Sequence, residues 1–172
     1  MAEDGTIASY TQNSNSIFEG YVRYPDGNFV TIALPGGGTG WHKGTAVQAI
    51  NSRGIIAGYY QDQNSTNHGF VGPPKGPFTE FDLPVGGTSY APGTTPTNIA
   101  AGGEIAGFYG DVTGVSHGFI RHPDGAYTTF DAPGAGTRWD QGTIVSDLNA
   151  AGQITGYYLD ANGASHGFVR IP

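Results

Sequence analysis

Short stretches of aromatic and β-branched residues alternate along the chain with turns rich in glycine, proline, asparagine and aspartate. None of these stretches has apolar residues at helical spacing, and such short stretches between turn residues are typical of strands. One full set predicts four strands, at about residues 116–122, 126–131, 143–149 and 153–159. Short turns join them, apart from a longer loop at about 132–142, so they should pair as an antiparallel meander. The pattern predicts an all-β fold.

The same pattern recurs every 49 residues without insertion or deletion. His68, His117 and His166 occupy one position of the motif, and Glu19 holds that position in the opening copy. A fixed period of this length indicates one supersecondary unit used repeatedly. We therefore expect a single repeat domain over residues 1–172, with a half repeat at 1–30, full repeats at about 44–83 and 93–132, and a partial repeat at 142–172.

Four-stranded antiparallel repeats of this length are typical of β-propeller blades. Three and a half periods are few for a closed propeller, so two chains could share one ring, or the chain could belong to a longer array. Three repeats of four strands also fit a three-fold β-trefoil or a β-prism-like fold. Because strand edges are exposed unless a ring closes, we expect the first and last half repeats to overlap, within one chain or between chains of a homo-oligomer.

Composition narrows the function classes. Thirty glycines and eleven prolines could indicate disorder, but aromatic residues make up 12% of the chain and recur in register, which disordered chains lack. A net charge of −7 without a basic cluster argues against a nucleic-acid partner. The lack of cysteine excludes disulfides and thiolate metal sites. No apolar stretch is long enough to span a membrane, and the first residues do not form a signal peptide.

Residues 51–58, NSRGIIAG, are followed by the motif His68-Gly-Phe70. This arrangement resembles the bacterial extracellular repeats called the HAF family, and it recurs at Asn149 with His166. Ala100 departs from the pattern, because it stands where the family has asparagine. The resemblance implies a secreted or surface-exposed, propeller-like protein, and the family offers no established catalytic residues.

An aspartate lies six residues before each repeated histidine. A five-residue loop between two paired strands should bring the two side chains together, so that the carboxylate orients the imidazole. We assign these residues a structural role, with a metal or acid–base site in each repeat as the alternative; they are Asp62 and His68, Asp111 and His117, and Asp160 and His166. Asp82 and Asp131, which follow phenylalanines, are interpreted as turn caps.

The long loops between repeats carry the candidate binding residues. Trp41, Tyr90 and Trp139 recur at one repeat position, while their neighbours differ, as in His42 and Asp140. Constant geometry with variable polar tips is typical of binding loops, and flat aromatic rings beside polar groups suit sugars. The alternative is that each ring fills a gap between repeats. We predict that these five residues bind ligand and that the two tryptophan sites dominate.

Catalytic motifs are weaker. Residues 114–118 and 163–167 match Gly-x-Ser-x-Gly, but the serine enters a strand and no helix follows, as the nucleophile elbow requires. The loops starting at Asp62 and Asp160 lack the distal glutamate of a calcium loop. We expect no metal and no cofactor. The non-repeated acids, with His42 or His122, remain catalytic candidates without assigned roles; they are Glu19, Glu80, Glu104, Asp140 and Asp147.

The sequence thus favours a non-catalytic module that binds glycans or another extracellular ligand through its aromatic loops. A carbohydrate-active enzyme, either a glycoside hydrolase or a lyase, is the alternative, and an assembly piece is a third possibility. Symmetry separates them: equivalent shallow sites favour binding, whereas one deep pocket lined by non-repeated acids favours catalysis.

Overall fold

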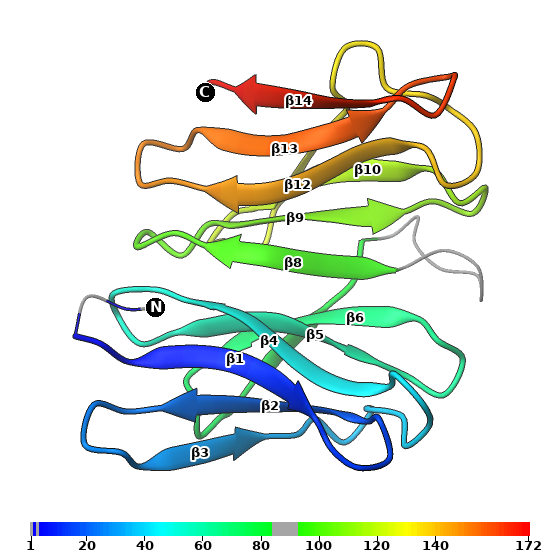
Figure 1. The fold of residues 1–172 in the computed structure, drawn as a ribbon. Helices are drawn as coiled ribbons and strands as arrows, with labels where there is room; N and C mark the ends of the chain where they lie inside the picture. The colour runs from blue at the N-terminus through cyan, green and yellow to red at the C-terminus, as the bar shows by residue number, and fades with distance from the viewer. Residues whose placement is uncertain (1, 3, 84–92) are drawn as a thin grey trace.

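The computed structural model describes residues 2, 4–83 and 93–172, and regular structure there consists of strands (Figure 1). The described residues contain no helix that is long and apolar enough to cross a membrane. The prediction of an all-β fold is confirmed. The strands are β1 (Ile7–Gln12), β2 (Phe18–Arg23), β3 (Phe29–Ile32), β4 (Gly44–Ile50), β5 (Ile56–Gln61), β6 (Asn67–Gly72), β7 (Thr79–Phe81), β8 (Thr94–Ile99), β9 (Ile105–Gly110), β10 (Ser116–Arg121), β11 (Tyr127–Phe130), β12 (Gly142–Leu148), β13 (Ile154–Leu159) and β14 (Ser165–Arg170).

These strands form four groups of neighbours, which we call units. Unit 1 is β1–β3, unit 2 is β4–β7, unit 3 is β8–β11 and unit 4 is β12–β14, and within each unit consecutive strands pair antiparallel. Units 1 and 2 form one seven-stranded sheet, and units 3 and 4 form the other. The four strands that the sequence predicts correspond to β10–β13 within one residue at each end.

Single parallel bridges join the units within each sheet. Phe18 of β2 pairs with Gly44 of β4, and Ser116 of β10 pairs with Gly142 of β12. Both glycines have positive φ angles, 106° and 107°. A Cβ at Gly44 would overlap the carbonyl oxygen of Phe18, and one at Gly142 would overlap that of Ser116. The bridge therefore requires glycine, because the two backbones approach closely there.

Consecutive units are held together by three apolar clusters. Val22 and Ile32 of unit 1 pack with Val47, Ile56 and Phe70 of unit 2. The second cluster joins units 2 and 3, and its buried members are Ala57, Phe81, Leu83, Ile99, Ile105, Tyr109 and Phe119. The third cluster joins units 3 and 4, and its buried members are Ala106, Val145, Leu148 and Ile154. Each unit thus buries its apolar face against the next one, which is where burial stabilises the fold most.

The units are stacked in chain order, so the first and the last lie at opposite ends of the array (Figure 1). In the described residues β1 pairs only with β2, and β14 pairs only with β13. Among the described residues the two half repeats therefore do not overlap within one chain, because the stack of units separates them; overlap between chains stays a prediction.

Candidate functional site

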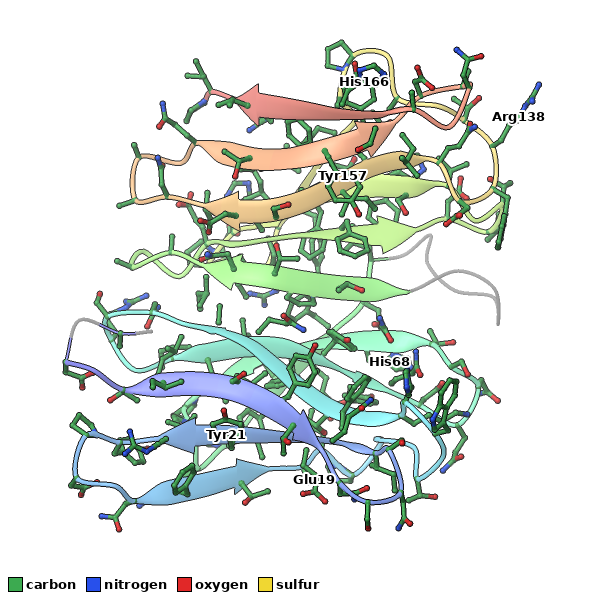
Figure 2. The ribbon with its side chains drawn as sticks, viewed as in Figure 1. Glu19, Tyr21, His68, Arg138, Tyr157 and His166 are labelled. Carbon is green, nitrogen blue, oxygen red and sulfur yellow. The ribbon has the colours of Figure 1, made fainter. Side chains whose placement is uncertain are left out.

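One side of the stack, at the same end of the strands in every unit, contains the turns before β2, β6, β10 and β14 and the long loops before β4 and β12. We call this side the loop end. Figure 2 shows Glu19, His68 and Arg138 at this end. Backbone hydrogen bonds tie each long loop to the turn of the preceding unit. The N–H of His42 donates to the carbonyl oxygen of Ser16 at 2.8 Å, and the N–H of Asp140 donates to that of Gly114 at 3.0 Å.

The tryptophans of these two loops are largely exposed to solvent. Trp41 retains 73% of its accessible surface and Trp139 retains 63%. Tyr90, the third predicted aromatic, lies outside the described residues. Trp side chains are usually buried to a large extent, so two exposed copies at one repeat position are unusual. Neither ring is buried between units, although Trp139 lies against Gly114 of unit 3.

The residue after each tryptophan has a left-handed backbone. His42 has φ 60° and Asp140 has φ 63°. Residues other than glycine rarely adopt this conformation, and strained backbone of this kind clusters at functional sites. The bonds to Ser16 and Gly114 hold the strained residues in place, so the exposed rings are presented on fixed turns.

The two tryptophans have different surroundings. The ring of Trp41 lies 3.9 Å from that of His42, which continues through Phe18 to Tyr10 as a chain of aromatic contacts. Trp139 instead lies against Gly114. Its neighbours Arg138 and Asp140 are both exposed. The same backbone platform thus offers an aromatic surface at one site and charged groups at the other.

Each repeated histidine contacts the aspartate six residues before it. The Nε2–Oδ2 distances are 3.6 Å for His68 and Asp62, 3.4 Å for His117 and Asp111, and 3.1 Å for His166 and Asp160. The hairpin geometry predicts this proximity. The Oδ1 atom of each aspartate accepts two backbone N–H groups of its own turn, for example from Thr66 and Asn64 onto Asp62. One carboxylate therefore fixes both the turn and the histidine ring.

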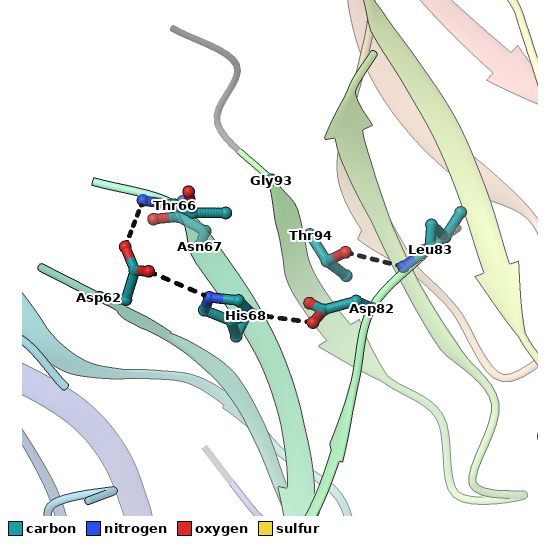
Figure 3. A pocket seen from close by; sticks show the side chains of 8 residues that line it. All are labelled: Asp62, Thr66, Asn67, His68, Asp82, Leu83, Gly93 and Thr94. Atoms are coloured by element: carbon teal, nitrogen blue, oxygen red, sulfur yellow. Dashed lines mark hydrogen bonds and ion pairs between the residues drawn. The ribbon is translucent and has the colours of Figure 1, made fainter. Parts of the chain in front are cut away.

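A second carboxylate faces two of these rings. The Nδ1 atom of His68 lies 2.8 Å from Asp82, and that of His117 lies 2.8 Å from Asp131 (Figure 3 shows the first case). Asp82 and Asp131 therefore have a contact that differs from the turn-capping suggested by the sequence. Tyr60 also stacks on His68, with ring centroids 4.9 Å apart. The imidazole of His68 is thus held by a carboxylate at each ring nitrogen and by Tyr60 on one face.

The first and last units vary this arrangement. In unit 1 the amide of Asn13 donates to Glu19 at 2.9 Å, at the positions of the aspartate and the histidine. In unit 4 the only carboxylate that contacts His166 among the described residues is Asp160. The contact that fixes the turn is thus present in every unit, whereas the second carboxylate occurs only in units 2 and 3.

Electrostatics at the loop end follow from these contacts. Burial raises the pKa of Asp62, but hydrogen bonds from the backbone of Thr66 and Asn64 and the nearby His68 outweigh it, so the pKa is lowered. At Asp160 the hydrogen bond with His166 is the main cause of a lowered pKa. Burial, together with a hydrogen bond to Glu80, raises the pKa of Tyr60. The aspartates are therefore charged at neutral pH.

A cavity of about 230 Å³ lies beside the ring of His68 (Figure 3). Asp62, Asp82 and Thr94 line it, and these are repeat positions. It ends at Gly93, next to residues 84–92, which the structure does not describe. The cavity therefore lacks the non-repeated acids that a single catalytic pocket would require.

The non-repeated acids are dispersed. Glu80 binds the hydroxyl of Tyr60, Glu104 faces His122 at 3.9 Å, and Asp147 binds the amide of Asn98. The cavities that contain Glu104 and Asp147 hold one of these acids each. A glycosidase needs two carboxylates about 5–9.5 Å apart, and these contacts do not pair any two of them.

The sequence also raised two other chemistries, a serine nucleophile and a metal site. Ser116 and Ser165 open β10 and β14, so neither stands on a turn between a strand and a helix, where the nucleophile elbow places its serine. Within residues 2, 4–83 and 93–172, no three His, Asp or Glu side chains are arranged to hold a metal ion. Among the described residues, the distinctive feature of the loop end is the pair of exposed tryptophans.

Comparison with known proteins gives no family assignment: no protein-family model matches the chain, and no curated protein is significantly similar to it. These comparisons therefore do not identify the HAF-type repeat that the motifs resemble.

Proposed function

We propose that the protein is a non-catalytic ligand-binding module that recognises glycans through the tryptophans of its loop end, outside the cell or at its surface. The observation that carries the proposal is the exposure of Trp41 and Trp139 on loops whose backbone is pinned to the neighbouring unit. Exposed aromatic rings on a rigid support can stack on the C–H face of a sugar ring, while neighbouring polar groups bind its hydroxyls.

The neighbours of each ring support this chemistry. His42 lies beside Trp41, while Arg138 and Asp140 flank Trp139, and all three are exposed. Sugars present both donors and acceptors, and these side chains provide both. Because the two sets differ, we propose that the two loops bind the same glycan with different affinities.

We also propose that the four units are consecutive blades of a propeller-like array. Meanders of the same kind stack face to face in chain order, and the register of β5–β6 is repeated in β9–β10 and β13–β14. This arrangement favours blades over a β-trefoil. The loops before β4 and β12 both lie at the loop end, which suits multivalent recognition of a polymer.

A glycan array tests the proposal when it is probed with the wild-type protein and with the double variant Trp41→Ala/Trp139→Ala. We expect the wild type to bind a subset of oligosaccharides and the double variant to lose this binding with an unchanged melting temperature. His122→Ala lies on the side of the stack opposite the loop end. It is the control and should bind as the wild type does. Hydrolysis of polysaccharides by the same wild-type preparation would contradict the non-catalytic assignment.

A further inference from the structure

The ring of Trp139 lies on the backbone of the preceding turn, and glycine at position 114 makes this contact possible. A Cβ at Gly114 would lie 2.3 Å from Cδ1 and 2.9 Å from Nε1 of Trp139, and both distances are shorter than van der Waals contact. The turn itself tolerates serine. Ser16 and Ser65 occupy the same repeat position, also with positive φ angles, 59° and 68° against 81° for Gly114. The glycine is therefore explained by the ring that lies on it.

Trp41 does not have this support. The turn that pins its loop carries Ser16 at the position of Gly114, so a Cβ is present where Gly114 has none. The ring of Trp41 instead contacts the exposed side chain of its neighbour His42, with ring centroids 3.9 Å apart. Its exposed fraction is also larger, 73% against 63% for Trp139. The orientation of Trp41 thus depends on another surface side chain, whereas that of Trp139 depends on a fixed backbone.

The loop of Trp139 is also closed by a side chain. The Oε1 atom of Gln141 accepts the backbone N–H of Arg138 at 3.1 Å. In the other loop Lys43 stands at the position of Gln141 and contacts unit 2, and Gly40 stands at the position of Arg138. A lysine side chain has no acceptor, so it cannot form this bond, and glycine leaves the backbone before the ring with more conformational freedom. Three differences therefore make the Trp139 loop the more rigid of the two.

We propose that Trp139 forms the high-affinity glycan site and that Gly114 is the residue that positions its ring. The inference rests on the proposed function and adds which of the two sites dominates. Ordering a mobile side chain on binding reduces affinity, and a ring whose orientation is already fixed avoids most of this cost. Arg138, which precedes Trp139, points outward in Figure 2 and can donate hydrogen bonds to sugar hydroxyls.

Isothermal titration of two single-tryptophan proteins with an oligosaccharide selected on the glycan array tests the ranking. Trp41→Ala retains the Trp139 site, and Trp139→Ala retains the Trp41 site. We expect the first protein to bind about tenfold more tightly than the second. Adding Gly114→Ser to Trp41→Ala should weaken its binding by about tenfold, because the serine Cβ displaces the ring.

Gly163→Ser, added to Trp41→Ala in the same way, is the matched control. Gly163 occupies the same repeat position in unit 4 and has φ 80°, so the backbone cost of serine is the same as at Gly114. A Cβ there would meet no atom of the described residues within 4 Å. This change should therefore leave the affinity unchanged.

Tryptophan fluorescence reports the position of the ring without any ligand. The chain has two tryptophans, so Trp139 is the only one in Trp41→Phe. Adding Gly114→Ser should move its emission to longer wavelength and make it easier to quench with acrylamide, because the ring leaves the turn. Adding Gly163→Ser should change neither property.

Equal or tighter binding by Trp139→Ala would overturn the proposal. It would also be overturned if Gly114→Ser matched Gly163→Ser in both affinity and emission. The ranking of the two single-tryptophan proteins decides the matter even if Gly114→Ser fails to fold. Absence of glycan binding by the wild type would remove the proposed function and the ranking with it, whereas the emission of Gly114→Ser separately shows whether Gly114 positions the ring.

Discussion

The aspartates of the loop end each serve two neighbours. Oδ1 of Asp111 accepts the N–H groups of Thr113 and Val115, and Oδ2 faces His117. Removing the histidine leaves the turn intact but deprives Asp111 and Asp131 of their shared partner. The contribution of the ring therefore depends on how many carboxylates it contacts and how well it is shielded from water.

We predict that His117→Ala lowers the free energy of unfolding by about 1–3 kcal/mol, the usual effect of leaving hydrogen-bonding groups without a partner. His166→Ala should have a smaller effect, because His166 contacts one carboxylate and its side chain is 45% exposed, against 22% for His117. Urea denaturation of both variants measures the difference. Equal losses would show that the second carboxylate contributes nothing.

The same contacts predict a dependence of stability on pH. Burial raises the pKa of Asp111, but hydrogen bonds from Thr113 and Val115 outweigh it and lower the pKa below the ordinary value of 3.8. A lowered folded-state pKa gives stability that is complete above 3.8 and is lost as the pH falls through the folded-state value. Between pH 5 and pH 2 the urea midpoint of the wild type should therefore fall more than that of Asp111→Asn. Parallel pH profiles would contradict this.

At the scale of strands, the points where two backbones approach closely decide how units are joined. Gly142 combines a φ of 107° with a close approach to the carbonyl of Ser116. Gly27 also has a positive φ, 89°, but a Cβ there would meet no atom within 4 Å. Substitutions at these two glycines therefore separate the cost of a positive φ from the cost of steric overlap.

Gly27→Ala should therefore cost about 1–2 kcal/mol, the price of left-handed backbone in alanine. Gly142→Ala should cost clearly more, because the methyl group also forces β12 away from β10. Thermal unfolding monitored by circular dichroism compares the two variants. A similar loss for both would indicate that the parallel bridge tolerates displacement.

The strands could be predicted from the sequence because turn residues mark their ends. The prediction of a strand at about 153–159 matches β13, Ile154–Leu159. The contact between His117 and Asp131 was missed, because the two residues lie 14 positions apart. Hairpin register could have revealed it, since Gly118 faces Phe130 across the hairpin. The exposure of Trp41 could not be predicted, because it depends on how the loop folds against the preceding unit.

At the scale of the whole molecule, equivalent positions of successive units differ in burial within the described residues. Ala106 on β9 is fully buried against unit 4, and Thr155 on β13 occupies the same repeat position but is exposed. In the described residues unit 4 packs on Ala106, and no unit packs on Thr155. This pair therefore reports whether the array is open at unit 4 in solution.

Ala106→Arg should lower the free energy of unfolding by more than about 3 kcal/mol, because it buries an unpaired charge between units. Thr155→Arg should change it by less than about 0.5 kcal/mol, as is usual for exposed positions. Chemical denaturation of both variants gives the comparison. Strong destabilisation by Thr155→Arg at low protein concentration would mean that this face is covered.

The most direct test of the binding account is the stoichiometry of glycan binding, measured by isothermal titration with an oligosaccharide selected on the array. The wild type should bind one ligand at each of its two tryptophans, and Trp41→Ala and Trp139→Ala should each lose one site. Truncation of an aromatic contact typically costs about 2 kcal/mol or more, which removes the site from the measurable range. A single site that survives in both variants, or unfolding of both proteins, would contradict the account.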